Sequence, residues 1–287
     1  MAECTYNYRV TPLEFFLATL SLSIAAGLLG SLLGLGGGII VIPGLTLLLG
    51  VDIRYAIGAS IVSVIATSSG AAAAYVREHL ANLRVAMFLE LATTTGALTG
   101  AYVAGLISVR WLYIIFGVVM GYSAIAMFRK RHQKLEQDIP PDALSDRLSL
   151  HSTFYDEATS SHVSYRVARS RTGLGLMYIA GVVSGLLGIG SGALKVPAMD
   201  LAMRLPMKVS TATSNFMIGV TAAASAGVYF ARGDINPFIA APVASGVLVG
   251  ATVGSRLLGR LQSSSIRVAF VVVLLGISLQ MLYKGFA

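Results

Sequence analysis

The chain carries two copies of one sequence unit, and this duplication limits its fold more than any other feature. Shifting the 287-residue sequence by 154 positions, without a gap, aligns many identical residues. The matched pairs include Gly27 with Gly181, Gly34 with Gly188, Gly36 with Gly190, Pro43 with Pro197, Ser60 with Ser214, Tyr75 with Tyr229 and Gly105 with Gly259. One constant offset over such a length indicates an internal repeat, so the two halves are expected to share one fold.

The composition indicates that both copies lie in a membrane. Hydrophobic residues make up 55% of the chain and charged residues only 12%, against about 25% charged residues in soluble proteins. A helical crossing of a bilayer takes about 20 apolar residues. Apolar segments occupy residues 13–50, 53–76, 83–107, 110–128, 173–205, 209–231, 236–259 and 265–284. The sequence therefore predicts an all-α polytopic membrane protein with four hydrophobic segments in each of two homologous repeats.

Polar residues divide the chain between these segments. We predict an N-terminal tail at residues 1–12, a first transmembrane repeat at 13–128, a polar cytoplasmic linker at 129–172 and a second transmembrane repeat at 173–287. The linker is expected to be partly helical and not a third domain. The N-terminus lacks the basic region of a cleaved signal peptide, so its first apolar run is expected to remain as a span.

The first segment of each repeat is too long for one crossing and is interrupted by glycines, at residues 34–38 and 188–192. Each segment is expected to fold as a full helix followed, after the glycines, by a half-helix. Irregular backbone at membrane depth is tolerated only inside the protein or beside a water-filled cavity. Both breaks are therefore expected to face inward, where transporters with internal repeats bind their substrates.

The orientation depends on whether each half-helix counts as a crossing. With four crossings per repeat both termini are cytoplasmic, whereas with five the repeats are inverted and both termini lie outside. The second arrangement leaves the larger excess of Lys and Arg on the inside, as the positive-inside rule favours. We therefore expect inverted repeats in a multi-pass protein of the bacterial inner membrane. The same rule accounts for the net charge of +8, so no nucleic-acid partner is expected.

The two glycine breaks are the first candidate for a binding site. A helix that starts after a break presents unpaired N–H groups and the positive end of its dipole to an anion. The alternative is close helix packing, because small residues four positions apart also suit helix contacts. The candidate residues in the breaks are Gly36, Gly37, Gly38, Gly190, Ser191 and Gly192.

Lys195 is the sharpest single candidate, because it stands in an apolar stretch where the first repeat has Val41. A Lys buried in a membrane protein needs a partner, a wet cavity or a route to the interface. Three interpretations therefore stay open: contact with a bound anion, an ion pair with Asp200 or Glu90, or extension toward the membrane interface.

Three polar side chains and one carboxyl group complete the candidate site. Hydroxyl and amide groups at Ser60, Ser214 and Asn215 suit the oxygens of an oxyanion, and hydrogen bonding between helices is the alternative. Glu90 lies inside a span and is the candidate for proton coupling, since burial favours its proton-carrying form. Its alternative role is a structural partner for a basic side chain.

The sequence offers no enzyme site. Cys4 is the only cysteine, and no metal-ligand spacing, Ser/His/Asp arrangement or Walker loop occurs. We expect no catalytic residue, metal or cofactor, and a small anion and the lipid bilayer as partners. Packing faces are predicted at Gly96-xxx-Gly100 and Gly250-xxx-Gly254, either within the fold or between the protomers of a homodimer.

Three motifs stand out within the repeats. They are Gly-Leu-Gly-Gly-Gly-Ile-Ile-Val-Ile-Pro at residues 34–43, Gly-Ile-Gly-Ser-Gly-Ala-Leu-Lys-Val-Pro at 188–197, and Ala56-x-Gly58-Ala59-Ser60. Together they resemble the sulfite exporter TauE/SafE family, over nearly the whole chain outside the linker. The resemblance implies a secondary transporter that exports small sulfur-containing anions such as sulfite, thiosulfate, sulfoacetate or related organosulfur acids. The alternatives are an anion channel or facilitator, or a carrier of a small organic carboxylate.

Overall fold

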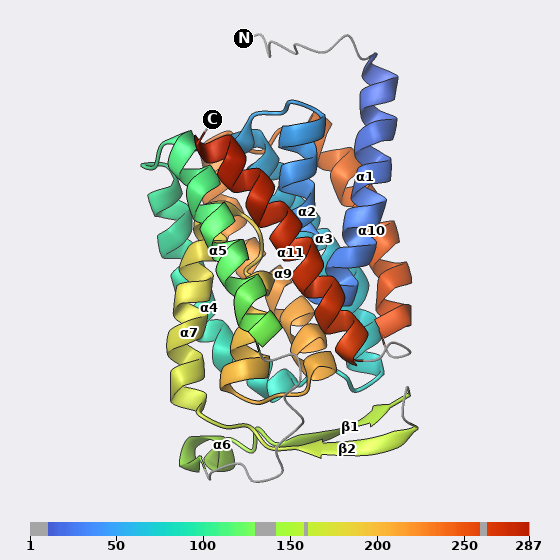
Figure 1. Cartoon of the computed structure of the whole chain (residues 1–287), viewed down its shortest axis with the longest axis vertical. Coiled ribbons are helices and arrows are strands. Elements are labelled where there is room, and N and C mark those ends of the chain that lie inside the picture. Colours follow the sequence, from blue (N-terminus) through green and yellow to red (C-terminus); the bar gives the residue numbers. More distant parts are fainter. Residues whose placement is uncertain (1–10, 130–141, 158–159, 259–262, 287) are drawn as a thin grey trace.

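The structure is a computed structural model that describes residues 11–129, 142–157, 160–258 and 263–286. The predicted N-terminal tail lies almost wholly outside the described residues, as do residues 130–141 of the linker. The chain forms an elongated helical bundle with a small β-hairpin at one end (Figure 1).

The first repeat contains five helical units. They are α1 (Pro12–Leu33), α2 (Gly38–Pro43) with its π-helical continuation η1 (Gly44–Leu48), α3 (Ile53–Arg77), α4 (Leu83–Ala104) and α5 (Val109–Arg129). α1 begins at a capping box, in which Thr11 and Glu14 accept hydrogen bonds from each other's backbone N–H. α2 changes to the wider π-helical turn directly after Pro43, whose missing N–H interrupts the α-helical bond series.

The second repeat contains the same five units. They are α7 (Ser170–Leu187), α8 (Gly192–Pro197) with η2 (Ala198–Ala202), α9 (Met207–Ala231), α10 (Pro237–Leu258) and α11 (Ser263–Phe286). Each unit after α7 starts 154 residues after its counterpart. The first segment of each repeat splits into a long and a short helix as expected, so the four predicted segments per repeat become five units.

The linker differs from an all-helical expectation. It contains a short helix, α6 (Ala143–Arg147), and two antiparallel strands, β1 (Ser152–Asp156) and β2 (Ser161–Tyr165), with Ser152 opposite Tyr165. Phe154 and Tyr165 are 5% and 7% exposed, so the hairpin has one buried side against the bundle. Aromatic residues favour strands that are buried on one side in this way. The sequence reasoning predicted partial helix here and missed the hairpin.

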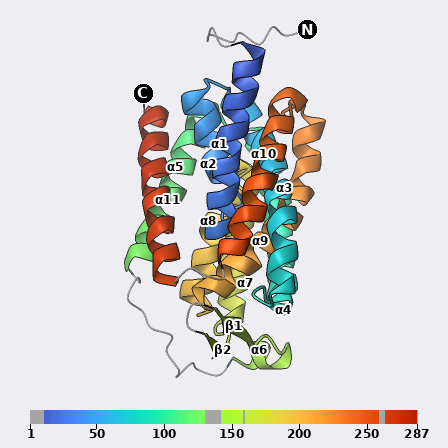
Figure 2. The same cartoon turned by 90° about the vertical axis from the view of Figure 1, so that its right-hand side faces the viewer.

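The two repeats pack against each other crosswise. α1 lies along α10, and its counterpart α7 lies along α4 (Figures 1 and 2). Glycines let these helices meet backbone to backbone: a Cβ on Gly100 would collide with the carbonyl oxygen of Val182, and one on Gly250 with that of Ile24. Both predicted glycine faces are therefore used within the fold.

The bundle has two distinct ends. The start of α1 and the end of α11 lie at one end, which we call the terminal face, and the linker elements α6, β1 and β2 lie at the other, the linker face (Figure 1). α1 starts at the terminal face, whereas α7 starts beside the linker.

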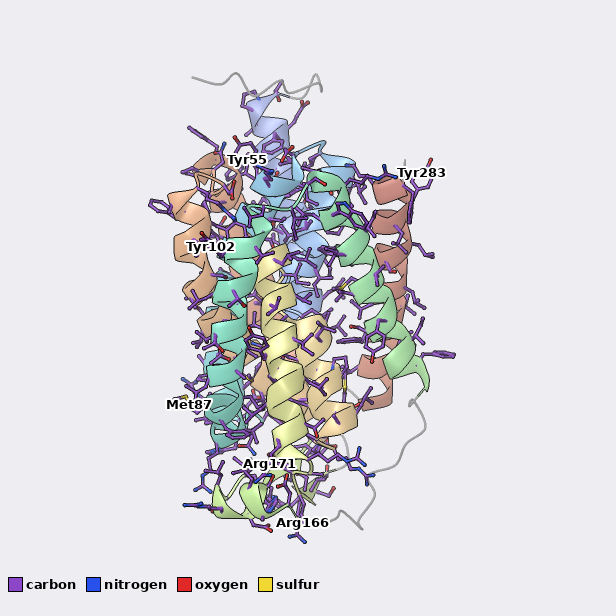
Figure 3. All side chains as sticks on the ribbon, turned by 90° about the vertical axis from the view of Figure 1, so that its left-hand side faces the viewer. Tyr55, Met87, Tyr102, Arg166, Arg171 and Tyr283 are labelled. Carbon is purple, nitrogen blue, oxygen red and sulfur yellow. The ribbon has the colours of Figure 1, made fainter. Side chains whose placement is uncertain are left out.

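The outer surface suits a lipid environment. Within the part of the chain that the structure describes, five helices are long and apolar enough to cross a membrane: Pro12–Leu33, Ile53–Arg77, Ser170–Leu187, Pro237–Leu258 and Val268–Phe286. Exposed apolar side chains cover the bundle, among them Leu91 at 75% and Leu279 at 69% exposure. In Figure 3, Tyr102 and Tyr283 lie toward the terminal face and Arg166 and Arg171 at the linker face, the positions that aromatic and basic residues prefer at membrane boundaries.

Candidate substrate site

The two breaks are sharp turns in left-handed backbone. Six residues there have positive φ angles: Gly34, Gly36 and Gly37 with 71°, 76° and 70°, and Gly188, Gly190 and Ser191 with 66°, 78° and 59°. Glycine takes this conformation at little cost, which explains the glycine-rich motifs. Ser191 is the one non-glycine residue among the six, and its hydroxyl donates to the Gly190 carbonyl oxygen at 2.7 Å.

The breaks meet at the centre of the bundle. A Cβ on Gly192 would collide with the carbonyl oxygen of Gly34, so the second break lies directly against the first. Gly36 and Gly190 both contact Val64 and Ile218, which occupy equivalent positions in the two repeats. The two half-helices therefore start from one shared central point.

Each break is bound by a serine of the opposite repeat. The Ser60 hydroxyl donates to the Gly188 carbonyl oxygen at 2.8 Å, and the Ser214 hydroxyl donates to the Gly34 carbonyl oxygen at 2.9 Å. Gly38 also lies beside Ser60, since a Cβ on Gly38 would collide with the Ser60 hydroxyl oxygen. Both serines are fully buried. In this structure they stabilise the crossing of the breaks, as in the packing alternative considered for them.

Asn215 adjoins the first break and has one unsatisfied polar atom. Its Nδ2 donates to the Ser31 carbonyl oxygen at 2.7 Å, while its buried Oδ1 accepts no hydrogen bond from the described residues. Thr211 lies one turn earlier on α9, against Gly34, and its buried hydroxyl also lacks a partner among the described residues. Buried polar groups without partners are rare, and local strain, a bound water or a bound ion can account for them.

Lys195 and Glu90 form a buried charged pair beside the breaks. Lys195 is 0% exposed and lies one helical turn after the second break. Its backbone N–H donates to the Ser191 carbonyl oxygen at 2.8 Å. Its Nζ donates to the Thr221 hydroxyl at 2.6 Å and lies 3.7 Å from Glu90 Oε2. Thr221 in turn donates to Glu90 Oε1 at 2.6 Å. Of the three interpretations left open for Lys195, this geometry matches the ion pair with Glu90.

Glu90 is held by two hydroxyl groups. Thr94, one turn further along α4, donates to Oε1 at 3.0 Å in addition to the bond from Thr221. Oε2 is buried and accepts no hydrogen bond from the described residues. One carboxylate oxygen is thus fixed by two hydroxyl groups, while the other lies 3.7 Å from the ammonium group of Lys195.

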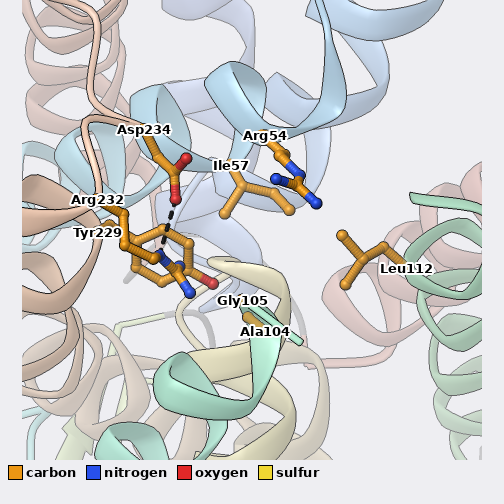
Figure 4. A pocket seen from close by; sticks show the side chains of 8 residues that line it. All are labelled: Arg54, Ile57, Ala104, Gly105, Leu112, Tyr229, Arg232 and Asp234. Carbon is orange, nitrogen blue, oxygen red and sulfur yellow. Dashed lines mark hydrogen bonds and ion pairs between the residues drawn. The ribbon is translucent and has the colours of Figure 1, made fainter. Parts of the chain in front are cut away.

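A cavity lies on the terminal side of the second break. Its volume is about 210 Å³, and Arg54, Ile57, Tyr229, Arg232 and Asp234 line it with residues from the ends of α4 and α5 (Figure 4). It contains none of the residues that the sequence singled out as candidates. A comparison of the two repeats would have singled out Arg232 as a difference between them, because the first repeat has Glu78 at the equivalent position.

The structure brings most of the predicted residues together. The glycines of both breaks, Ser191, Ser60 and Ser214 meet at the crossing, with Lys195 and Glu90 beside it and Asn215 at the first break. Sequence reasoning missed Thr221, which connects Lys195 to Glu90. The 154-residue offset pairs Thr221 with Thr67, but only the fold shows which residues Thr221 touches. Among the described residues no group of His, Cys, Asp and Glu could hold a metal ion.

Duplicated helices of membrane-spanning length, two breaks that cross at the centre and a buried charged pair beside them define a membrane protein of the transporter class. The chain belongs to the sulfite exporter TauE/SafE family, whose sequence pattern matches residues 19–281. This confirms the resemblance seen in the glycine motifs.

Its relatives cover nearly the whole chain. It is 28% identical over 278 residues to the "Probable membrane transporter protein YunE" of Bacillus subtilis strain 168, across 94% of this chain and 98% of the relative. It is 26% identical to a "Probable membrane transporter protein" from each of two Xylella fastidiosa strains, Temecula1 and 9a5c, across 92% of this chain and 94% of each relative. No solved structure matches the chain.

Proposed function

We propose that this protein is a secondary transporter that moves small sulfur-containing anions out of the cell by alternating access, through a site where the two breaks cross. The observation that carries the proposal is the fully buried Lys195, which lies one turn from the second break and opposite Glu90. An ammonium group inside a membrane protein selects negative charge, because an unpaired charge there costs several kcal/mol or more. The family name supplies the substrate class.

We propose further that the repeats are inverted, with the linker face in the cytoplasm. α1 starts at the terminal face and α7 at the linker face (Figure 1), and equivalent helices exchange partners in the pairs of α1 with α10 and α7 with α4. Inverted repeats provide two related conformations, each open to one side of the membrane. The basic residues of the linker agree with a cytoplasmic position.

Glu90 supplies a route to proton coupling. While Glu90 is ionised, it neutralises Lys195 at 3.7 Å. When Glu90 takes up a proton, Lys195 loses this counter-charge, and a substrate anion replaces it. A divalent anion that leaves together with this proton carries one net negative charge, and an inside-negative membrane potential favours its exit by about 2.3 kcal/mol per 100 mV.

Proteoliposomes test this proposal directly. Purified protein is reconstituted, and the uptake of sulfite, thiosulfate, sulfate and sulfoacetate is measured with and without imposed pH and voltage gradients. We expect saturable uptake of at least one sulfur anion, driven uphill by a gradient. Saturable transport of only an organic carboxylate would disprove the substrate class. Flux that neither saturates nor runs uphill would instead show a channel or facilitator.

A further inference from the structure

The cavity at the terminal face has the size of a site for a small ion. Its volume of about 210 Å³ is below the range of roughly 300 Å³ and more in which drug-sized ligands bind. Two residues that line the cavity contact the second break or the helix just before it. The Tyr229 hydroxyl donates to the carbonyl oxygen of Gly185, in the last turn of α7, at 2.6 Å, and Ile57 lies against Gly188. A ligand in this cavity is therefore one side chain, Ile57, away from the break.

Arg232 is fixed in place at the cavity wall. Its Nε donates to Asp234 at 3.0 Å, and another guanidinium nitrogen donates to the Ala101 carbonyl oxygen at 3.0 Å. The guanidinium also stacks 4.4 Å from the centre of the Tyr229 ring. A guanidinium held on several sides loses little conformational freedom when an anion binds it, and its planar fork matches the oxygens of an oxyanion.

Arg54 gives the cavity a net positive charge. Its side chain projects into the cavity from the first turn of α3 (Figure 4), so Arg54 and Arg232 face a single carboxylate, Asp234. Asp234 is paired with Arg232 at 3.0 Å, so the excess positive charge of the lining is that of Arg54. A cleft with an excess of one sign of charge raises the local concentration of counter-ions. The cavity therefore favours anions over neutral and cationic solutes.

The equivalent positions at the linker face lack this character. The 154-residue offset places Lys208 at the position of Arg54 and Glu78 at that of Arg232. Lys208 is 1% exposed, and its Nζ is bound to Asp156 of the hairpin at 2.7 Å. The charge of Lys208 is thus neutralised by Asp156 of the linker, and Glu78 stands at the position that Arg232 occupies in the second repeat.

We infer that the terminal-face cavity is a separate recognition site, in which a small oxyanion binds between Arg54 and Arg232 on its way to or from the central breaks. The inference rests on the proposed function for the choice of ligand, which is the substrate class itself. It adds a second binding site, on one side of the membrane only, to the central site.

Binding to purified protein in detergent tests the inference without any transport step. Thiosulfate is titrated by calorimetry into a Lys195→Met/Glu90→Gln variant, which lacks the central charges but keeps both arginines of the cavity. We expect binding to remain in this variant, and to weaken about tenfold when Arg54→Gln is added. Binding that disappears with the central charges, or that is indifferent to Arg54→Gln, would overturn the inference.

Transport kinetics give an independent measurement. Proteoliposomes captured through a C-terminal tag present the terminal face outward, and thiosulfate uptake is followed in Arg54→Gln and in a matched control, Arg110→Gln. Arg110 lies at the same face, outside the cavity, with its Nε bound to the Gly285 carbonyl oxygen at 3.2 Å. We expect the apparent KM to rise about tenfold in Arg54→Gln, to recover in Arg54→Lys, and to stay unchanged in the control.

The two experiments separate failure of the inference from failure of the proposed function. If wild-type protein transports no anion but binds thiosulfate in an Arg54-dependent way, the proposed function is wrong and the recognition site stands. If transport is saturable and Arg54→Gln behaves as wild type in both measurements, the transporter stands and the recognition site is wrong.

Discussion

The Ser60 hydroxyl donates to the Gly188 carbonyl oxygen at 2.8 Å, so a helix of the first repeat binds the break of the second. The bond is reciprocal, since Ser214 at the equivalent position binds Gly34 at 2.9 Å. Each break is thereby attached to the long helix of the other repeat. A conformational change that separates the repeats must either carry each break with the opposite repeat or release these two bonds.

The charged pair at Lys195 is predicted to be required for transport and not only for folding. Lys195→Met removes the ammonium group and leaves the Glu90 carboxylate unpaired, which destabilises the protein by about 3 kcal/mol. Adding Glu90→Gln removes the unpaired charge, so the double variant is expected to recover stability but to remain inactive. Thermal unfolding in detergent and proteoliposome uptake measure the two effects. A double variant with wild-type uptake would assign the pair a purely structural role.

Glu90→Gln alone is predicted to uncouple transport from the pH gradient. Glutamine keeps acceptor and donor groups near Thr221 and Thr94, but it cannot exchange a proton with the solution. We expect accumulation driven by a pH gradient to be lost, while exchange of labelled for unlabelled substrate continues. The relevant measurement is uptake across imposed pH gradients, and an unchanged pH response in the variant would exclude this role for Glu90.

Gly185 is predicted to be intolerant of any side chain. A Cβ there would collide with the Ala97 carbonyl oxygen where α7 meets α4, so Gly185→Ala is expected to destabilise the protein by about 1–3 kcal/mol. Gly175 lies on the same helix, and apart from its chain neighbours and the nearby backbone of that helix no atom lies within 4 Å of its Cβ position. Gly175→Ala is the matched control and is expected to be neutral or slightly stabilising. Thermal unfolding of both variants checks the contrast, and equal midpoints would contradict the crosswise packing.

The ion pair of Asp156 and Lys208 is predicted to help attach the hairpin to the bundle. Their side chains are 13% and 1% exposed and lie 2.7 Å apart, so Asp156→Asn leaves a buried ammonium group with weaker partners and costs about 3 kcal/mol. Hydrogen exchange of β1 and β2 is expected to accelerate. The control is Arg166→Gln, since Arg166 and Asp146 form a 3.4 Å pair that is about half exposed and contributes at most about 1 kcal/mol.

The contribution of Glu78 to the stability of the folded protein is predicted to increase as the pH falls. Burial raises the pKa of Glu78 above its ordinary value of 4.5, and the nearby negative charge of Glu157 raises it further. A carboxyl group with a raised pKa stabilises the folded state fully below its ordinary value, and this contribution is lost as the pH rises through the raised value. Glu78→Gln should therefore stabilise the protein at pH 7 and have little effect at pH 4, as measured by thermal unfolding. A constant difference between wild type and variant across this range would rule out the titration.

The repeat was readable from the sequence because it is a property of residue order. The constant offset, the glycine breaks and the apolar lengths predicted two helical repeats, each with a first segment that splits. The start of each unit after α7 then follows its counterpart by 154 residues, as the alignment predicts. Local rules were sufficient here, because glycine at positive φ and a run of about 20 apolar residues act within one segment.

Contacts between the repeats were decided only by the tertiary structure. Lys195 was recognisable as an unusual residue, but its pairing with Glu90 through Thr221 joins α8 and α9 of the second repeat to α4 of the first. The lining of the cavity at Arg54 and the place where the hairpin contacts the bundle likewise depend on which helix ends lie next to each other. The sequence placed a charged residue, Lys195, inside an apolar run near a break and left open whether it is buried or reaches the membrane interface. Its partner was set by crosswise packing of the repeats, since charges separated along the chain interact only where the fold brings them within a few ångströms.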